Sequence, residues 1–137
     1  MLTIPDSNVI LDLLLDNKNW GAWSDRQFAR CRSEGELVMT PVVFSEISPE
    51  FRTFDQAHSM IDSLGFARED IPYSAAYLAG QAHAAYRKRG GERARTLPDF
   101  LVGAHAAVQG YRILTRDASR YRGYFPNVEV IAPDSHP

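Results

Sequence analysis

The sequence has few of the features that mark secreted or membrane-spanning proteins. It contains a single cysteine, Cys31, so no disulfide can form within the chain, which is typical of a reducing compartment. Its longest apolar runs, such as 9–15, are far shorter than the roughly 18 residues of a membrane-spanning helix, and Asp12 interrupts that run. The N-terminus has no basic region followed by an apolar stretch, which a secretory signal requires. We therefore expect a cytoplasmic protein without a membrane-spanning segment.

A strong charge of either sign is also missing. Lysine and arginine number 15 against 17 aspartates and glutamates, and a net charge of -2 argues against a surface built throughout for nucleic acid. The 45% hydrophobic and 23% charged residues are close to globular averages, and there is no repeat, low-complexity segment or linker. A chain of 137 residues is therefore expected to form a single domain, 1–137, around one core.

Short apolar runs alternate with helical patterns along the chain. The sequence predicts strands at 2–4, 37–40, 112–115 and 128–131, and the connection at 65–72 can hold another. It predicts helices at 9–14, 20–32, from 41 onward, at 54–64, 73–89 and 96–109, and a helical turn at 117–124. Because strands that alternate with helices pair in parallel, we expect an α/β sandwich with a mainly parallel sheet.

Four acidic residues stand where these elements would place a carboxylate at an element end. Asp6 and Asp117 directly follow strands. Glu46 lies about a turn and a half into the helix that Pro41 begins, and Asp99 lies in the first turn of another helix. Ligands gather where the carboxyl ends of parallel strands meet the following helix N-termini, so we expect all four acids at one edge of the sheet.

Each acid taken alone has a simpler explanation. Asp6 and Asp117 can cap helices, the Thr96-x-x-Asp99 spacing approximates a capping box, and Glu46 can be a solvated helix residue. The joint pattern is explained less well, because four carboxylates at one edge raise one another's pKa unless a cation compensates them. Ligands that are all oxygen favour Mg²⁺ or Mn²⁺ over Zn²⁺, and the four histidines show no pairing at ligand spacing.

The motifs around these acids resemble those of the PIN-domain nucleases, specifically the VapC toxins of bacterial toxin-antitoxin pairs. The four motifs are IPDSNVILDLL at 4–14, SEI at 45–47, LPDFLVGAHA at 97–106 and LTRDASRY at 114–121. They occur in the order of the family and span essentially the whole chain. One departure is Tyr121, which stands where the family often has Phe.

This resemblance implies a PIN-like three-layer α/β/α sandwich with a short central sheet of four or five strands. It further implies a set of metal-binding and catalytic acids with two supporting polar residues. These are Asp6, Glu46, Asp99 and Asp117 as ligands of Mg²⁺, which Mn²⁺ can replace, and Asn8 and Thr115 in support.

The function that the resemblance implies is that of an endoribonuclease toxin. Such an enzyme hydrolyses phosphodiester bonds in structured RNA, such as tRNA or rRNA, with a metal-activated water. A VapB-like antitoxin would inhibit it. The toxin would form a homodimer, and a heterotetramer or larger assembly with the antitoxin.

Three arginines are candidate contacts for RNA or for an antitoxin. Arg93 and Arg95 belong to the basic run 87–95, which lies just before Asp99, so they could clamp phosphates beside the metal. Arg116 lies between the strand and Asp117 and could serve either partner. Favourable placement of cations at a helix end explains the residues at 87–89 equally well.

Two other functions stay open at this point. A phosphatase or phospho-acceptor domain would use Asp6 as its nucleophile, although Asn8 stands where a second Asp is expected and no Lys follows the later strands. A non-catalytic PIN-fold binding module would act only by pairing with a DNA-binding partner, and the intact acids argue against it. Trp20, Trp23 and Phe44 are expected to pack in the core or to line a groove for a partner helix.

Overall fold

A five-stranded parallel sheet organises the chain in a computed structural model that describes residues 1–91 and 95–137. The strands are β1 (Thr3–Pro5), β2 (Leu37–Met39), β3 (Phe66–Arg68), β4 (Arg112–Leu114) and β5 (Val130–Ile131). Their order is β3-β2-β1-β4-β5, and every neighbouring pair is parallel. Every residue of β1, β2, β4 and β5 is buried, as expected for short apolar strands covered on both faces.

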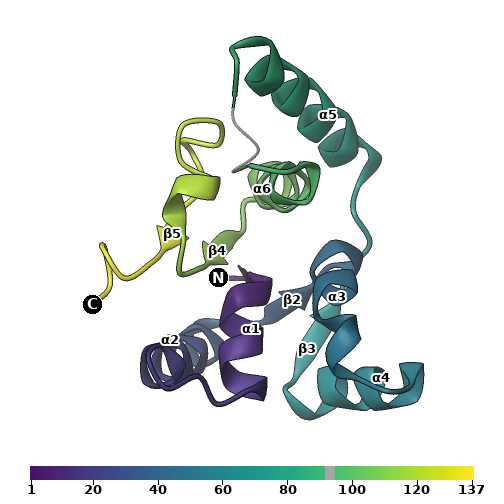
Figure 1. The fold of residues 1–137 in the computed structure, drawn as a ribbon, viewed down its shortest axis with the longest axis vertical. Coiled ribbons are helices and arrows are strands. Elements are labelled where there is room, and N and C mark those ends of the chain that lie inside the picture. The colour runs from purple at the N-terminus through teal and green to yellow at the C-terminus, as the bar shows by residue number, and fades with distance from the viewer. Residues whose placement is uncertain (92–94) are drawn as a thin grey trace.

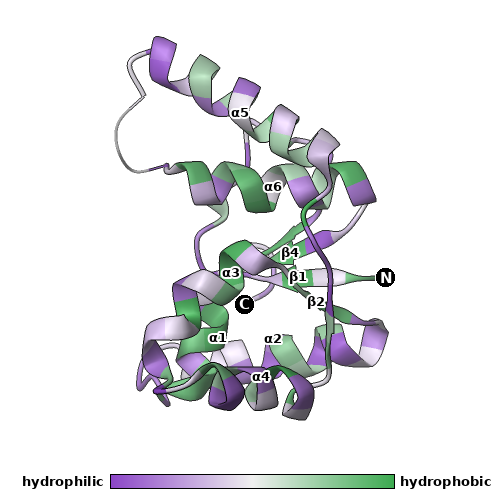
Figure 2. Cartoon of the chain, turned by 90° about the vertical axis from the view of Figure 1, so that its right-hand side faces the viewer, coloured by the Kyte–Doolittle hydropathy of each residue, from purple (hydrophilic) through white to green (hydrophobic). Residues whose placement is uncertain are grey.

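Helices cover the two faces of this sheet and complete the three layers that were expected. The helices are α1 (Ser7–Leu14), α2 (Gly21–Glu34), α3 (Pro41–Ile47), α4 (Phe54–Ser63), α5 (Tyr73–Lys88) and α6 (Leu97–Gln109), with the 3-10 turns η1 (Ser48–Glu50) and η2 (Ala118–Arg120). Helices α1, α2 and α4 lie on one side of the sheet, and α5 and α6 lie on the other (Figures 1 and 2). Helix α3 contacts both α1 and α6. Over the described residues, no helix has the length and apolar character needed to cross a membrane.

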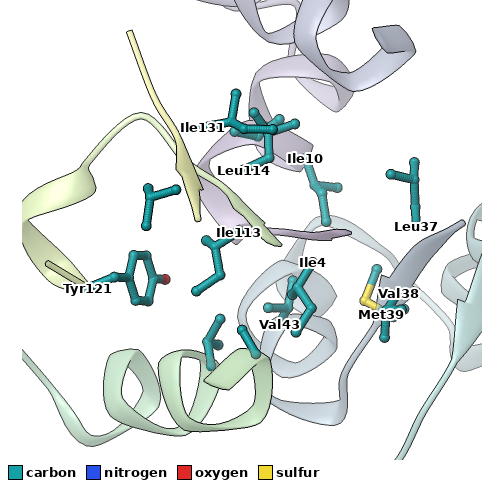
Figure 3. Packing of buried hydrophobic residues seen from close by; sticks show 14 of the residues in the cluster. Ile4, Ile10, Leu37, Val38, Met39, Val43, Ile113, Leu114, Tyr121 and Ile131 are labelled. Carbon is teal, nitrogen blue, oxygen red and sulfur yellow. The ribbon is translucent and has the colours of Figure 1, made fainter. Parts of the chain in front are cut away.

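Buried side chains from the strands and from the facing helices form the core (Figure 3). Ile4 of β1 and Ile113 of β4 lie at the centre of the sheet, and Ile10 of α1 and Val43 of α3 pack against it; all four are at most 1% exposed. Full burial of one such side chain stabilises the fold by roughly 1.5–3 kcal/mol. This packing holds the carboxyl ends of β1 and β4 at fixed positions beside one another.

Polar side chains cap the helices that begin at this edge of the sheet. The side chain of Asp6 accepts a hydrogen bond from the Ser7 backbone N–H at the start of α1, at 2.8 Å. Thr40 caps α3 before Pro41. Thr96 and Asp99 form the capping box of α6 that their spacing indicated. Asp6 and Asp99 therefore have a structural task as well, and Asp117 caps η2 in the same way.

The segment after β4 follows the sequence-based expectation except in the length of its strand. The helical turn expected at 117–124 is present as η2 and the hydrogen-bonded turn that follows it, in which the Phe125 N–H donates to the Tyr121 carbonyl at 3.1 Å. The Asp117 side chain begins this turn by accepting a hydrogen bond from the Ser119 backbone N–H at 3.2 Å. The strand expected at 128–131 is limited to β5.

Substitution of Gly103 by alanine is expected to lower the free energy of unfolding. A Cβ atom at this position of α6 would lie 2.4 Å from the ring of the buried Phe125, so the ring or the helix must shift. Overpacking of this kind costs about 1–3 kcal/mol. Gly80→Ala is the matched control, because a Cβ there in α5 meets nothing within 4 Å, and it should stabilise the helix by about 0.5–1 kcal/mol. Urea denaturation of both variants measures the difference, and equal midpoints would contradict the close packing of α6 against Phe125.

Candidate functional site

Asp6 is the buried carboxylate at the centre of the candidate site, with 1% of the residue exposed. It directly follows β1, and its Oδ1 accepts the Ser7 N–H at 2.8 Å. Its Oδ2 accepts hydrogen bonds from the Thr115 hydroxyl at 3.0 Å and from the Tyr121 hydroxyl at 2.7 Å. A buried charge is costly unless it is hydrogen-bonded or paired, so these three donors both stabilise the carboxylate and fix its orientation.

Tyr121 is suited to this role because it stays protonated. Burial, followed by the nearby charge of Asp6, holds the pKa of the Tyr121 hydroxyl well above its ordinary value. The hydroxyl therefore remains a donor to Asp6 at every physiological pH. The aromatic residue that departs from the family pattern thus provides a hydrogen bond that Phe could not make.

Thr115 and Asn8 connect Asp6 to the loop that follows β4. Thr115 Oγ1 accepts hydrogen bonds from Asn8 Nδ2 at 3.2 Å and from the backbone N–H of Asp117 at 3.1 Å. Asn8 Oδ1 in turn accepts the backbone N–H of Arg116 at 3.2 Å. The two residues proposed as pocket support therefore lie beside Asp6, and they hold α1 and the Asp117 loop in register.

Arg120 lies between three of the four candidate acids. Its Nη1 atom is 3.9 Å from Asp6 Oδ2 and 3.7 Å from Asp99 Oδ1, and its Nε atom is 3.3 Å from Asp117 Oδ2. Arg120 is not among the site residues expected from the sequence. Its signal was the spacing of three positions from Asp117, which places oppositely charged side chains next to each other on a helical turn.

The environments of Asp99 and Asp117 shift their pKa values in opposite directions. Burial is the main reason that the pKa of Asp99 is raised, and the charge of Asp6 adds to it against the opposing effects of Thr96 and Arg120. Burial also opposes ionisation of Asp117, but the hydrogen bond from Ser119 and the charge of Arg120 outweigh it and lower the pKa. Asp117 is therefore the easier of the two to keep ionised.

Glu46 lies on α3 and faces the same cluster. Glu46 is exposed, yet the pKa of its carboxyl group is raised, first by partial desolvation and then by the charge of Asp6. Asp99 adds to this rise, whereas a hydrogen bond with Ser7 opposes it. Glu46 is thus within electrostatic reach of two other acids, so all four candidate acids face a common region at the carboxyl edge of the sheet.

The donor set suits a hard divalent cation, but the side chains are not arranged around one. All four candidate groups offer carboxylate oxygen, which Mg²⁺ prefers. In the two described stretches, no three His, Cys, Asp or Glu side chains form a group that could hold a metal ion. The guanidinium of Arg120 supplies the positive charge in their midst instead. The acids therefore fit Mg²⁺ in the chemistry of their oxygen atoms, whereas in this structure the positive charge near Asp6, Asp99 and Asp117 belongs to Arg120.

The three candidate arginines have different surroundings. Arg116 forms an ion pair with the buried Asp12, with 2.9 Å between Nε and Oδ2, and lies over the Trp20 ring at 5.6 Å. This structural partner was not foreseen from the sequence. Arg95 lies over the rings of Tyr86 and Tyr124, at 5.7 and 5.5 Å from their centroids. Arg93 lies outside the described residues.

Open hollows lined by basic and aromatic side chains adjoin the cluster. One lies beside Trp20 and the other beside Tyr86 and Tyr124, and both share Arg95, Asp117 and Ser119. Guanidinium groups bind phosphate, and aromatic rings stack on bases. The surface next to Asp117 therefore has the chemistry of a nucleic-acid contact.

Trp20, Trp23 and Phe44, which were expected either in the core or along a groove, differ in their exposure. Trp23 is buried, and its Nε1 donates a hydrogen bond to the His136 carbonyl at 2.6 Å. Trp20 is 36% exposed. Phe44 lines a separate apolar hollow with Phe54, and their ring centroids are 6.2 Å apart. Trp23 therefore packs in the core, whereas the groove for a partner helix stays a prediction.

Comparison with known proteins shows the fold. No family model matches the sequence, and no curated protein matches it. A solved structure of VapBC2 from Rickettsia felis, bound to a promoter DNA fragment, has a chain that aligns with a TM-score of 0.73 and 12% identity, over 96% of this chain and 98% of that one. VapBC-1 from nontypeable Haemophilus influenzae aligns with a TM-score of 0.72 and 16% identity, over 96% and 98%. FitAcB from Neisseria gonorrhoeae aligns with a TM-score of 0.63 and 20% identity, over the full length of both chains.

The parallel sheet, its two helical layers and the likeness over nearly the whole chain define a PIN-like α/β/α fold and confirm the expected fold class. The particular version of this fold is the one found in the VapBC toxin-antitoxin structures.

Removal of the Tyr121 hydroxyl is expected to destabilise the protein. Tyr121→Phe leaves the buried Asp6 with one donor fewer on Oδ2, which should cost about 1–3 kcal/mol of the free energy of unfolding. Tyr124→Phe is the matched control, because within residues 1–91 and 95–137 the structure gives the Tyr124 hydroxyl no hydrogen bond. Urea denaturation without metal compares the two, and equal losses would argue against the Tyr121–Asp6 bond.

Asp99→Asn should change the pH dependence of stability in a defined direction. An acid whose pKa is raised in the folded state contributes stability that is fully present below its unfolded pKa, near 3.8, and is lost as pH rises through the folded value. Asparagine keeps a cap oxygen but does not ionise. In EDTA-treated protein, the stability of Asp99→Asn relative to the wild type should therefore be greater at pH 7 than at pH 3. A constant difference across this range would contradict the raised pKa.

Proposed function

We propose that this protein is a Mg²⁺-dependent endoribonuclease and the toxin of a toxin-antitoxin pair. The observation that carries the proposal is the convergence of Asp6, Asp99 and Asp117 around one cationic group, with Glu46 in electrostatic reach. Structural caps explain Asp6, Asp99 and Asp117 singly, but they do not explain why four carboxylates face a common region. The likeness to VapBC structures supports the same reading.

In this proposal, the burial of each acid decides whether it binds the metal directly. Asp6 and Asp99 are buried and held by hydrogen bonds, so they would bind Mg²⁺ directly and in a fixed geometry. Glu46 and Asp117 are more exposed, so they would act through water or on a second ion. The bound metal would lower the pKa of a water molecule and stabilise charge on the leaving oxygen of the phosphodiester.

Glu46 is the acid best suited to accept the proton of the attacking water. Its pKa is raised by partial desolvation and by neighbouring acids, which brings it nearer to the operating pH than an ordinary glutamate. The water oxygen would form the new bond to phosphorus while the bond to the leaving oxygen of the RNA chain breaks. Asn8 and Thr115 would position the acids without touching the substrate.

The hollows beside Asp117 support RNA as the substrate. Arg95 lies over Tyr86 and Tyr124, and Arg89 lies over Tyr124 at 5.4 Å, so charge and stacking surfaces alternate there. Proteins read RNA mostly at unpaired bases that stack on aromatic rings, as in the loops of tRNA or rRNA. Arg95 is therefore the stronger candidate for RNA contact, whereas Arg116 is held by Asp12.

The proposal includes a VapB-like antitoxin as inhibitor, a homodimer, and a heterotetramer or larger assembly in the cytoplasm, formed by one domain over 1–137. It rests on the likeness to the VapBC structures and to a toxin-antitoxin complex from Klebsiella pneumoniae. The alternative of a phospho-acceptor on Asp6 is disfavoured, because Asn8 stands where a second Asp is expected and no Lys follows the later strands. A purely non-catalytic module would not need four facing acids.

A cleavage assay with purified protein freed of its antitoxin tests the proposal. Structured RNA should be cut at defined positions in Mg²⁺ or Mn²⁺ and stay intact in EDTA. Asp6→Asn should reduce the rate by at least about 100-fold, the scale expected when a group that stabilises transition-state charge is lost. Asp25→Asn is the matched control, since Asp25 is an exposed acid on α2, and it should cleave like the wild type. RNA that stays intact with both metals, or equal rates for the two variants, would overturn the proposal.

A further inference from the structure

Arg120 is bound to the acidic cluster more loosely than its central position suggests. Only its contact with Asp117 is a hydrogen bond, from Nε to Oδ2 at 3.3 Å. Its Nη1 atom lies 3.9 Å from Asp6 and 3.7 Å from Asp99, beyond the distance of a good hydrogen bond. Arg120 therefore acts on these two acids mainly through its charge.

The acids keep their own hydrogen bonds whether or not Arg120 is present. Asp6 Oδ2 is held by Thr115 and Tyr121, and Asp99 Oδ2 is held by the backbone N–H of Thr96 at 3.1 Å. Asp99 Oδ1 faces Arg120 alone among the described partners. Withdrawal of the guanidinium would thus leave the carboxylates oriented but without a compensating charge.

Arg120 also has room to withdraw. It ends the three-residue turn η2, its side chain is 32% exposed, and Ser119 and Asp117 beside it line the open hollows. A rotation of its long side chain toward solvent requires no movement of the backbone. Two cations, by contrast, repel each other strongly at the short distances of this cluster.

We propose that Arg120 is a resident counter-cation of this site, and that a divalent metal ion binds by displacing its guanidinium from between Asp6, Asp99 and Asp117. This inference rests on the proposed function for the claim that the acids bind metal. Arg120 is then a positioning residue that keeps the acids together in the metal-free protein and weakens their affinity for the metal. The apparent affinity falls because only molecules with the guanidinium withdrawn are competent to bind.

Metal affinity measured by isothermal titration calorimetry tests this inference without any assay of activity. EDTA-treated wild type, Arg120→Gln and Arg122→Gln are each titrated with Mn²⁺ and with Mg²⁺. Arg120→Gln should bind with a dissociation constant lower by roughly 10-fold or more, the effect expected if the competent fraction in the wild type is about one tenth or less. Arg122→Gln removes the same charge two residues away, from an exposed ion pair with Asp134, and should bind like the wild type.

Nuclear magnetic resonance of the wild type covers the case in which Arg120→Gln does not fold. The Arg120 Nε–H signal, assigned through its loss in Arg120→Lys, should shift as Mg²⁺ is added, with the same midpoint as calorimetry. Metal binding that leaves this signal unchanged, or equal affinities of Arg120→Gln and Arg122→Gln, would overturn the displacement while the metal site stands. No binding of either metal to the folded variants and the wild type would overturn the proposed function together with this inference.

Discussion

The structure depends on one buried charge, the carboxylate of Asp6 at the end of the central strand. Its oxygens are held by the N-terminus of α1, by Thr115 after β4 and by Tyr121 after η2. A buried carboxylate without donors would become neutral or would destabilise the fold, so the contacts that bring these segments to Asp6 stabilise the folded chain. The requirement that stabilises Asp6 is therefore also what assembles the candidate site around it.

Charge balance around Asp6 links stability to the proposed chemistry. Asp99 and Glu46 have raised pKa values because burial and neighbouring acids oppose their ionisation. Arg120 offsets part of this repulsion, and a divalent ion would offset more of it. In the proposed function, the acids that Arg120 leaves uncompensated would attract a metal ion to this site. Such a compromise is expected wherever function requires like charges to lie together.

Local patterns were enough to predict most of the architecture. Alternating apolar runs and helical periods indicated a parallel α/β sheet, and Pro41 and the Thr96-Asp99 spacing marked two helix starts that the structure contains. The helical turn predicted after β4 is present, whereas the last strand is shorter than the apolar run at 128–131 indicated. The four acids could be assigned to one edge of the sheet because strand ends and helix starts are local features with a fixed place in such folds.

The sequence by itself determined where strands and helices form, which residues cap the helices and which acids lie at element ends. Each of these features depends on neighbours within a few positions. Only the tertiary structure decided which charges meet. It paired Arg116 with Asp12 and placed Arg120 among Asp6, Asp99 and Asp117. These contacts join segments that are up to 114 positions apart, as between residues 6 and 120. A long arginine side chain can reach an acid on a distant segment, and no periodic pattern in the sequence marks that acid. Such ion pairs are therefore known only from the packed structure.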